Sequence, residues 1–196
     1  MGSLVLLTPR LVLRSWQVDD IPQLLPLISA REVAATTLRI PHPYTQTDAE
    51  EFVRRTDQEQ VRCAILLAGT STLIGGVGLR LNQDHNHAEI GYWLGVPYWG
   101  KGYATEASAE LLRYGFEELK LHRIYASHFA HNPASGNILR KIGMKYEGHQ
   151  RGHLMKWDEY LDLEMYGIVA QDFVGQSKKP LTEESMKIDQ GRKEVP

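Results

Sequence analysis

The sequence predicts a single α/β (α+β) domain built on a mixed, mostly antiparallel sheet. Its 196 residues are 42% hydrophobic, which suffices for one buried core. Short β-rich runs follow one another across polar loops, a pattern that favours antiparallel pairing. Stretches with helical periodicity separate the remaining runs. We expect this domain to span residues 1–173, and a flexible or weakly helical tail to span 174–196, where the apolar pattern fades.

The strands are predicted from apolar runs bounded by turn residues. Alternating apolar and polar residues mark the first run, LVLRSW. Gly, Asn, Asp and Pro bound most of the others. The predicted strands are 11–16, 61–67, 72–81, 87–95, 123–129, 144–148 and 161–169.

Two helices are predicted in the first third of the chain. An acidic start followed by Pro22 predicts a helix over 19–29. Thr47 as N-cap, with Glu50 three residues later, has the spacing of a capping box and predicts a helix from 47 to about 60.

Two more helices follow in the second half. A broad apolar face predicts a long helix after the PYWGKGYA turn, ending near Lys120. Asn132 is a preferred N-cap, Pro133 suits the first helical position, and Gly143 suits the position after the last turn. The apolar face comprises Ala107, Leu111, Leu112, Gly115, Phe116 and Leu119.

Composition excludes several classes of function. A net charge of −2 gives no basic footprint for nucleic acid or an anionic membrane. Cys63 is the only cysteine, which excludes an internal disulfide and a cysteine-rich zinc site. His87 and Glu89 share a strand face, but no third ligand follows at a recognised spacing, so no metal is expected. Without a membrane span or a leader pattern, we expect a soluble, cytoplasmic protein.

The segment from Pro97 to Ala107 joins a strand to a helix through two glycines. Gly100 and Gly102 lack Cβ atoms, so an anion can approach the backbone closely. The free N–H groups and the dipole of the following helix favour a phosphate or pyrophosphate there. The competing interpretation is a tight turn with no ligand. Neither the P-loop pattern nor the third Rossmann glycine is present.

The run AEIGYWLGVPYWGKGYATEA (88–107) resembles the central motif, [QR]-x-x-G-x-[GA], of the GNAT superfamily of acetyl-coenzyme A-dependent N-acetyltransferases. Trp99, Gly102 and Ala104 occupy its defining positions, and Trp99 departs from the usual Gln or Arg. Other segments resemble the RimJ/RimL-like branch, which contains the ribosomal-protein alanine N-acetyltransferases. These segments are 7–16, 131–148 and 162–168.

The resemblance implies a GNAT fold and acetyl-coenzyme A (acetyl-CoA) as co-substrate. Two parallel strands, 88–94 and 123–129, are then expected to splay apart and expose backbone groups to the pantetheine arm. Backbone amides from Gly100 to Thr105 are expected to cradle the pyrophosphate. The residues implied to bind the co-substrate are Trp93, Leu94, Gly95, Trp99, Gly100, Lys101, Gly102, Tyr103, Ala104, Thr105, Asn132, Ser135 and Asn137.

Acetyl transfer requires a neutral amine, a polarised carbonyl and a stabilised thiolate. By resemblance, the Leu94 N–H is the candidate for the oxyanion. Glu89 is the candidate general base, against a solvent-facing carboxylate or a partner for Arg123, and His153 is a weaker candidate. Ser135 is the candidate donor to the thiolate, against a hydroxyl that only reinforces the Asn132 cap.

The predicted function is acetyl transfer to a primary amine. An α-amine with a pKa of about 7.8 gives up its proton at pH 7 for about 1 kcal/mol, whereas lysine, at about 10.4, costs about 4.6 kcal/mol. A protein N-terminus is therefore favoured. The alternatives are a small amine (polyamine, amino acid or aminoglycoside), a non-catalytic acyl-CoA sensor, and a nucleotide-binding regulator.

The acceptor pocket and the oligomeric state, monomer or homodimer, stay open at this stage. The segments expected to shape the pocket, 30–45 and 149–160, carry no recognised motif. The candidate acceptor-binding residues are Arg31, Arg39, His42, Tyr44 and His153.

Overall fold

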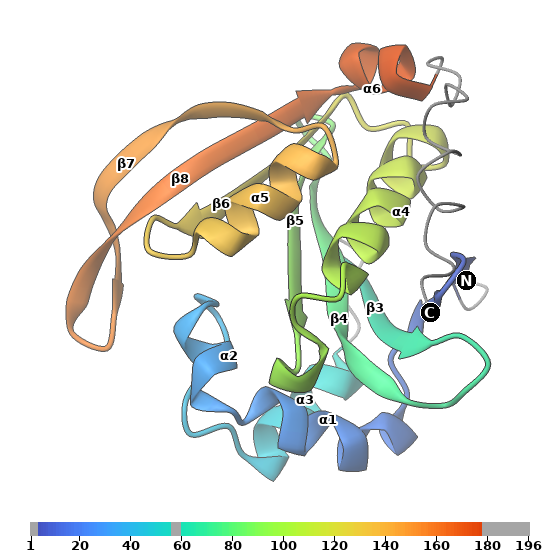
Figure 1. Cartoon of the computed structure of the whole chain (residues 1–196), viewed down its shortest axis with the longest axis vertical. Coiled ribbons are helices and arrows are strands. Elements are labelled where there is room, and N and C mark those ends of the chain that lie inside the picture. The colour runs from blue at the N-terminus through green and yellow to red at the C-terminus, as the bar shows by residue number, and fades with distance from the viewer. Residues whose placement is uncertain (1–3, 56–59, 178–196) are drawn as a thin grey trace, which may run out of the picture.

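The computed structural model describes residues 4–55 and 60–177 and confirms the predicted α/β class. Within these residues, eight strands form one sheet in the order β1-β2-β3-β4-β5-β6-β8-β7 (Figure 1). All neighbours pair antiparallel except β5 and β6, which pair parallel. The strands are β1 (Val5–Leu7), β2 (Leu11–Ser15), β3 (Gln60–Leu67), β4 (Leu73–Asn82), β5 (His87–Leu94), β6 (Arg123–Phe129), β7 (Lys145–Lys156) and β8 (Glu159–Val169).

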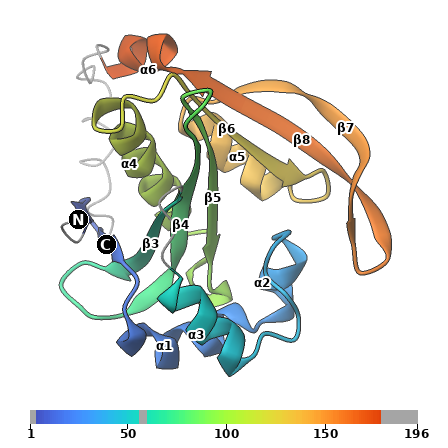
Figure 2. The same cartoon turned by 180° about the vertical axis from the view of Figure 1, so that it is seen from behind.

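Helices cover both faces of this sheet. Successive residues of β3 point to opposite faces: Cys63 and Ile65 pack in the same core as α4, whereas Ala64 and Leu66 pack with α1 and α3. Figure 1 shows the α4 side, and Figure 2, from behind, shows the α1–α3 side. The helices are α1 (Ile21–Ile28), α2 (Arg31–Ala35), α3 (Gln46–Arg54), α4 (Tyr103–Glu117), α5 (Pro133–Lys141) and α6 (Ala170–Ser177), with short 3-10 turns η1 (Val18–Asp20) and η2 (Val96–Tyr98).

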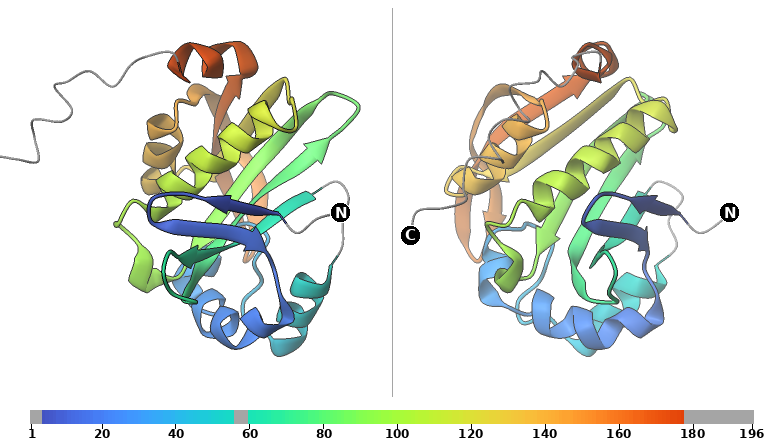
Figure 3. Two further views of the ribbon diagram at one scale, coloured as in Figure 1. Left: turned by 90° about the vertical axis from the view of Figure 1, so that its right-hand side faces the viewer. Right: turned by 45° about the vertical axis from the view of Figure 1, so that its right-hand side comes forward.

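The predicted apolar face of α4 is buried. Ala107, Leu111 and Leu112 are fully inaccessible, and Gly115 packs so closely on Ile124 of β6 that a Cβ atom there would lie 2.7 Å from its side chain. Figure 3 shows this helix lying along the sheet. This packing therefore holds the first turn of α4 in a fixed position relative to the ends of β5 and β6.

The parallel pair of β5 and β6 is short. Its register covers only His87–Glu89 against Arg123–Tyr125, although both strands continue beyond these residues. The backbone of β5 after Glu89 therefore no longer pairs with β6, which confirms the expected splay.

The segment 149–160, which carries no recognised motif, lies mostly in β7 and completes a long hairpin with β8. Register shifts interrupt the pairing between Tyr146 and Gly148 and between Gln150 and Leu154. Such bulges obscure the alternation from which strands are predicted, and this explains why only 144–148 was predicted.

The predicted helix over 47–60 is wrong at both ends. The helix begins after Thr45, whose Oγ1 accepts a hydrogen bond from Asp48 N–H (3.2 Å) while the Asp48 carboxylate accepts one from Thr45 N–H (2.7 Å). The capping box thus lies two residues earlier than Thr47 and Glu50. The helix ends at Arg54, and Gln60, its predicted end, is instead the first residue of β3.

Two short elements, β1 and α2, were not predicted, since they are three and five residues long. The predicted domain boundary at 173 falls inside α6, where Phe173 stacks on Phe116 at 4.9 Å between ring centroids. Most of the predicted tail, from 178 to 196, lies outside the described residues.

Candidate active site

The turn that leads into α4 has the open backbone that the sequence predicts. Gly100 and Gly102 adopt positive φ of 73° and 80°, a conformation that other residues avoid. Gly102 is the N-cap of α4 and provides no side-chain cap, so the amides of the first turn receive no acceptor from it. A Cβ atom built on Gly100 would meet nothing within 4 Å. The turn therefore has open space beside Gly100 and no side-chain cap for the first amides of α4.

The first turn of α4 is held in place by the hairpin of β1 and β2. Glu106 accepts hydrogen bonds from the Thr8 hydroxyl (2.7 Å) and the Arg10 backbone N–H (2.9 Å), and forms an ion pair with the Arg10 guanidinium (2.6 Å). Arg10 also donates to the Lys101 carbonyl at 3.0 Å. Burial alone would raise the pKa of Glu106, but these bonds outweigh it and lower that pKa. The negative charge of Glu106 is thereby balanced by Arg10 beside the glycine turn.

The end of β5 offers one backbone donor to the gap. Gly95 N–H bonds the Ile74 carbonyl of β4 at 2.9 Å, so the neighbouring Leu94 N–H points the other way, toward β6. By the same alternation, the backbone groups of Trp93 face β4. The Leu94 carbonyl accepts a hydrogen bond from the Trp99 indole N–H at 2.8 Å. Within the predicted segment Trp93–Gly95, the Leu94 N–H is thus the backbone donor that points into the gap between β5 and β6.

Ser135 lies across the gap from β5, in the first turn of α5. Its Oγ is 2.7 Å from the Tyr92 hydroxyl, which also donates to the Ser135 carbonyl at 3.2 Å. Burial raises the pKa of Tyr92 to about 12, so this hydroxyl keeps its proton at neutral pH. Tyr92 was not singled out in the sequence, because nothing local indicates that β5 faces α5 at this point.

The other two predicted residues of α5 have structural partners. The Asn132 side chain caps the helix by accepting the Ser135 N–H at 3.4 Å. The Asn137 carbonyl oxygen accepts a hydrogen bond from Arg140 at 2.5 Å, and Arg140 also donates to the Tyr166 hydroxyl. Of Asn132, Ser135 and Asn137, only Ser135 lines the cavity between β5 and β6.

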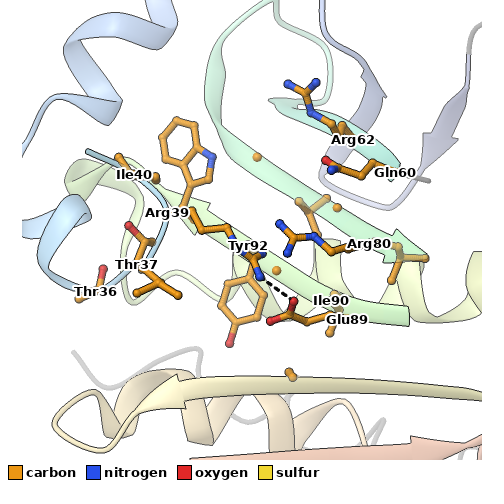
Figure 4. A pocket seen from close by; sticks show the side chains of 18 of the residues that line it. Thr36, Thr37, Arg39, Ile40, Gln60, Arg62, Arg80, Glu89, Ile90 and Tyr92 are labelled. Carbon is orange, nitrogen blue, oxygen red and sulfur yellow. Dashed lines mark hydrogen bonds and ion pairs between the residues drawn. The ribbon is translucent and has the colours of Figure 1, made fainter. Parts of the chain in front are cut away.

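A cavity of about 640 Å³ runs through the gap between β5 and β6 (Figure 4). It connects the hydroxyls of Tyr92 and Ser135 with the carboxylate of Glu89 on the opposite face of β5. Glu89 forms an ion pair with Arg39 (2.9 Å). The alternative that it pairs with Arg123 is wrong, since Arg123 pairs with Glu147 across Gly167, where a Cβ atom would collide with both side chains.

The structure brings some of the predicted acceptor residues to this cavity and leaves others out. Arg39 and Tyr44 line it, and Tyr44 is buried, which raises its pKa to about 12. Arg31 instead lies over the Trp157 ring (5.5 Å to the centroid), and His42 approaches the same ring. His153 is exposed on β7 and does not line the cavity, whereas its neighbour Leu154 does.

The described part of the chain, residues 4–55 and 60–177, shows neither a metal-binding cluster nor a membrane-spanning helix. No cluster of three or more His, Cys, Asp or Glu side chains there has the arrangement of a metal site. None of the helices in that part of the chain combines the length and apolar character needed to cross a bilayer.

Comparison with known proteins agrees with this geometry. Residues 10–145 match the model of the acetyltransferase (GNAT) domain. The chain is 30% identical to the N-acetyltransferase p20 of Bacillus licheniformis over 87% of this chain and 98% of that protein. It is also 30% identical to the Escherichia coli [ribosomal protein uS5]-alanine N-acetyltransferase, over 43% of each chain.

A solved structure extends the similarity to the fold. Spermidine N-acetyltransferase from Vibrio cholerae, in complex with CoA and spermine, matches with a TM-score of 0.75 and 25% identity over 85% of this chain and 99% of that one. With a family model that matches well over half of its length and a fold that splays at β5 and β6, the chain belongs to the GNAT family and is an acetyl-CoA-dependent N-acetyltransferase.

Proposed function

We propose that this enzyme acetylates an α-amine, most suitably the N-terminus of a protein, by direct attack of the amine on acetyl-CoA. One observation carries the proposal: a single cavity joins the Ser135–Tyr92 hydroxyl pair on one side of β5 to the Glu89 carboxylate on the other. A donor for the leaving group and an acceptor for the amine proton thus open onto the same space.

The turn before α4 fits the co-substrate. The amides from Gly100 to Thr105 would hold its pyrophosphate, and the open space at Gly100 leaves room for it. Acetyl-CoA supplies the activated acetyl group as a thioester. The Leu94 N–H would then bond the carbonyl oxygen as negative charge develops there, a preorganised contact worth several kcal/mol.

Ser135 would protonate the departing sulfur. Its hydroxyl lies 2.7 Å from the Tyr92 hydroxyl, which remains protonated at neutral pH. Tyr92 would orient Ser135, and a proton from solvent would replace the one that Ser135 gives to the sulfur.

Glu89 would take the amine proton, directly or through one water molecule. Its Oε2 accepts from Arg39, whereas Oε1 accepts no hydrogen bond from the residues that the structure describes. An amine of lower pKa gives up its proton at neutral pH more readily than lysine does. An α-amine, whose pKa lies about 2.6 units below that of lysine, needs less help.

The charges of the cavity favour an α-amine over a polyamine. A polycation would need several free carboxylates, and the described lining contains Asp48, Glu51 and Glu89. Asp48 is engaged in the cap of α3 and Glu89 in the pair with Arg39. A small-molecule amine remains the second candidate, because the similar solved structure is a spermidine acetyltransferase.

The test is a mass-spectrometric screen of peptides, amino acids and polyamines for a gain of one acetyl group, with thiol release followed in parallel. We expect acetylation of peptide α-amines, with kcat lowered about a hundredfold by Ser135→Ala and a similar loss near neutral pH for Glu89→Gln. The matched controls are Ser71→Ala and Glu50→Gln, outside the cavity lining. Acetyl-CoA binding without turnover of any amine would instead indicate the acyl-CoA sensor, and a preference for spermidine would indicate a polyamine enzyme.

A further inference from the structure

Arg80 presents a cation to the acceptor side of the cavity. It lies on β4 directly opposite Glu89 of β5, so the two side chains share one face of the sheet. Figure 4 shows its guanidinium on the cavity side, near the ion pair of Glu89 and Arg39. In the part of the chain that the structure describes, no hydrogen bond or ion pair joins this guanidinium to another group.

The neighbouring charges do not neutralise Arg80. Glu89 is already bound at 2.9 Å by Arg39, which leaves that pair without net charge. Arg62, on the adjacent strand, donates to the backbone carbonyls of Arg55 and Phe52 and is held in the wall. The wall beside Glu89 therefore carries excess positive charge where the acceptor amine must arrive.

This charge acts on an acceptor in two ways. A nearby guanidinium disfavours an ammonium ion and so favours the neutral amine that acetyl transfer requires. It also attracts any anionic group that the acceptor carries, and a guanidinium suits a carboxylate or a phosphate because it can donate two parallel hydrogen bonds. An acceptor with both groups satisfies both effects.

We propose that the acceptor of this enzyme carries an anionic group close to its amine, and that Arg80 binds that group. The inference rests on the proposed acetyl transfer and adds a substrate class to it. The anion can come from the α-carboxylate of a free amino acid or from an acidic second residue of a peptide. A polyamine, which carries only positive charge, would be excluded.

The experiment compares acceptors that differ by one charge. Alanyl-glutamate amide and alanyl-glutamine amide have nearly the same shape, and so do free alanine and alaninamide. The first pair tests an acidic second residue, the second pair tests an α-carboxylate, and spermidine serves as the cationic acceptor. We expect the anionic member of at least one pair to have a kcat/KM about tenfold to a hundredfold higher.

Variants assign that preference to Arg80. Arg80→Gln should abolish it by raising KM for the anionic acceptor far more than KM for the neutral acceptor, while KM for acetyl-CoA stays unchanged. Arg80→Lys, which keeps the charge but not the paired donors, should retain part of it. Arg54→Gln is the matched control, since Arg54 lies on α3 outside the cavity lining and its ion pair with Glu50 is long, at 3.8 Å.

The outcomes separate the two proposals. Turnover with equal rates for both members of each pair, a preference that Arg80→Gln leaves intact, or a preference for spermidine would overturn the anion site and leave acetyl transfer standing. If no acceptor is acetylated while acetyl-CoA still binds, the proposed function fails and the anion site fails with it.

Discussion

The two sides of the proposed site are built in different ways. Apart from Ser135 of α5, the proposed co-substrate side is one continuous segment outside the cavity lining, from Leu94 through the glycine turn to Glu106, and its key groups are backbone amides. The proposed acceptor side is the cavity itself, which draws side chains from the loop after α2, from α3, from β4 and β5, and from the β7–β8 hairpin. Local sequence therefore fixes the first side, whereas the second exists only after distant segments have met.

This difference in construction matches a difference between the two ligands, since the co-substrate is common to a family and the acceptor varies. Amides can bind a pyrophosphate whatever side chains surround them, provided that the turn has its shape. An acceptor would be distinguished by charged side chains, for which we propose Arg39, Arg80 and Glu89, and such side chains can change without altering the fold. Substitutions on the two sides should accordingly affect different kinetic constants.

Among the substitutions that compare the two sides, the largest effect is expected from Gly100→Val, on the proposed co-substrate side. The added side chain would fill the space proposed for the pyrophosphate and distort the turn, since φ is 73°. We expect KM for acetyl-CoA to rise about tenfold or more, corresponding to the loss of one charge-assisted hydrogen bond or more, at about 1.5–3 kcal/mol each. Initial rates at varied acetyl-CoA give this value.

Gly69→Val is the matched control for Gly100→Val. Gly69 also has positive φ, 75°, and open space around its Cβ position, but lies in the turn between β3 and β4. Both variants should lose about 1–2 kcal/mol of unfolding free energy. Equal KM values for acetyl-CoA in the two variants would contradict the assignment of the turn to the pyrophosphate.

A smaller effect is expected on the acceptor side, from Lys156→Met. The Lys156 ammonium donates to the carbonyls of Thr37 (2.5 Å), Leu38 (3.4 Å) and Ile40 (3.4 Å), and so ties the β7–β8 hairpin to a loop that lines the cavity. Releasing that loop should raise KM for the acceptor severalfold without changing KM for acetyl-CoA. Steady-state kinetics with both substrates varied measure the two constants.

Lys145→Met provides the comparison for Lys156→Met. Lys145 lies at the other end of β7 and pairs with Asp172 of α6 at 2.8 Å, away from the loop. Lys145→Met should leave KM for the acceptor and KM for acetyl-CoA unchanged. If Lys156→Met alters KM for acetyl-CoA as strongly as KM for the acceptor, the two sides are not independent.

The smallest effect is a pH dependence confined to the hairpin. His149 binds Glu164 (2.9 Å) and Asp162 (3.2 Å), and the hydrogen bond to Glu164, with the two negative charges, raises the pKa of His149 above 6.5. The hydrogen bond from His149 lowers the pKa of Glu164 below 4.5. The histidine contribution is thus fully present below pH 6.5 and lost as pH rises through the raised pKa, whereas the Glu164 contribution is lost as pH falls through the lowered one.

Hydrogen exchange of the β7 amides at about pH 6 and about pH 9, corrected for intrinsic rates, tests this dependence. The unmodified protein should be slightly better protected at the lower pH, and His149→Gln should remove the difference. His153→Gln, four residues along the same strand and exposed, should not. The same loss in both variants would show that His149 is not responsible.

Much of the fold could be predicted because its signals are local. The α4 stripe, the Asn132 cap and the β-rich runs each occupy a few adjacent residues, and apart from β7 their boundaries agree with the structure within a few positions. The opposition of Arg80 and Glu89 was not predicted, because it depends on the register between β4 and β5, which the predicted strand ends do not fix. The N-terminus of α3 was predicted wrongly because two overlapping residue pairs, Thr45 with Asp48 and Thr47 with Glu50, both have the spacing of a capping box.

By itself, the sequence determined the α/β class and a glycine turn suited to an anion, because backbone conformation responds to glycine, proline and the period of apolar residues. The tertiary structure alone decided that Tyr92 meets Ser135, that Arg39 rather than Arg123 binds Glu89, and that Arg31 and His153 lie outside the cavity. Such contacts join residues at least about 25 positions apart in the sequence. They depend on strand twist, bulges and close packing at glycines, which no local pattern encodes.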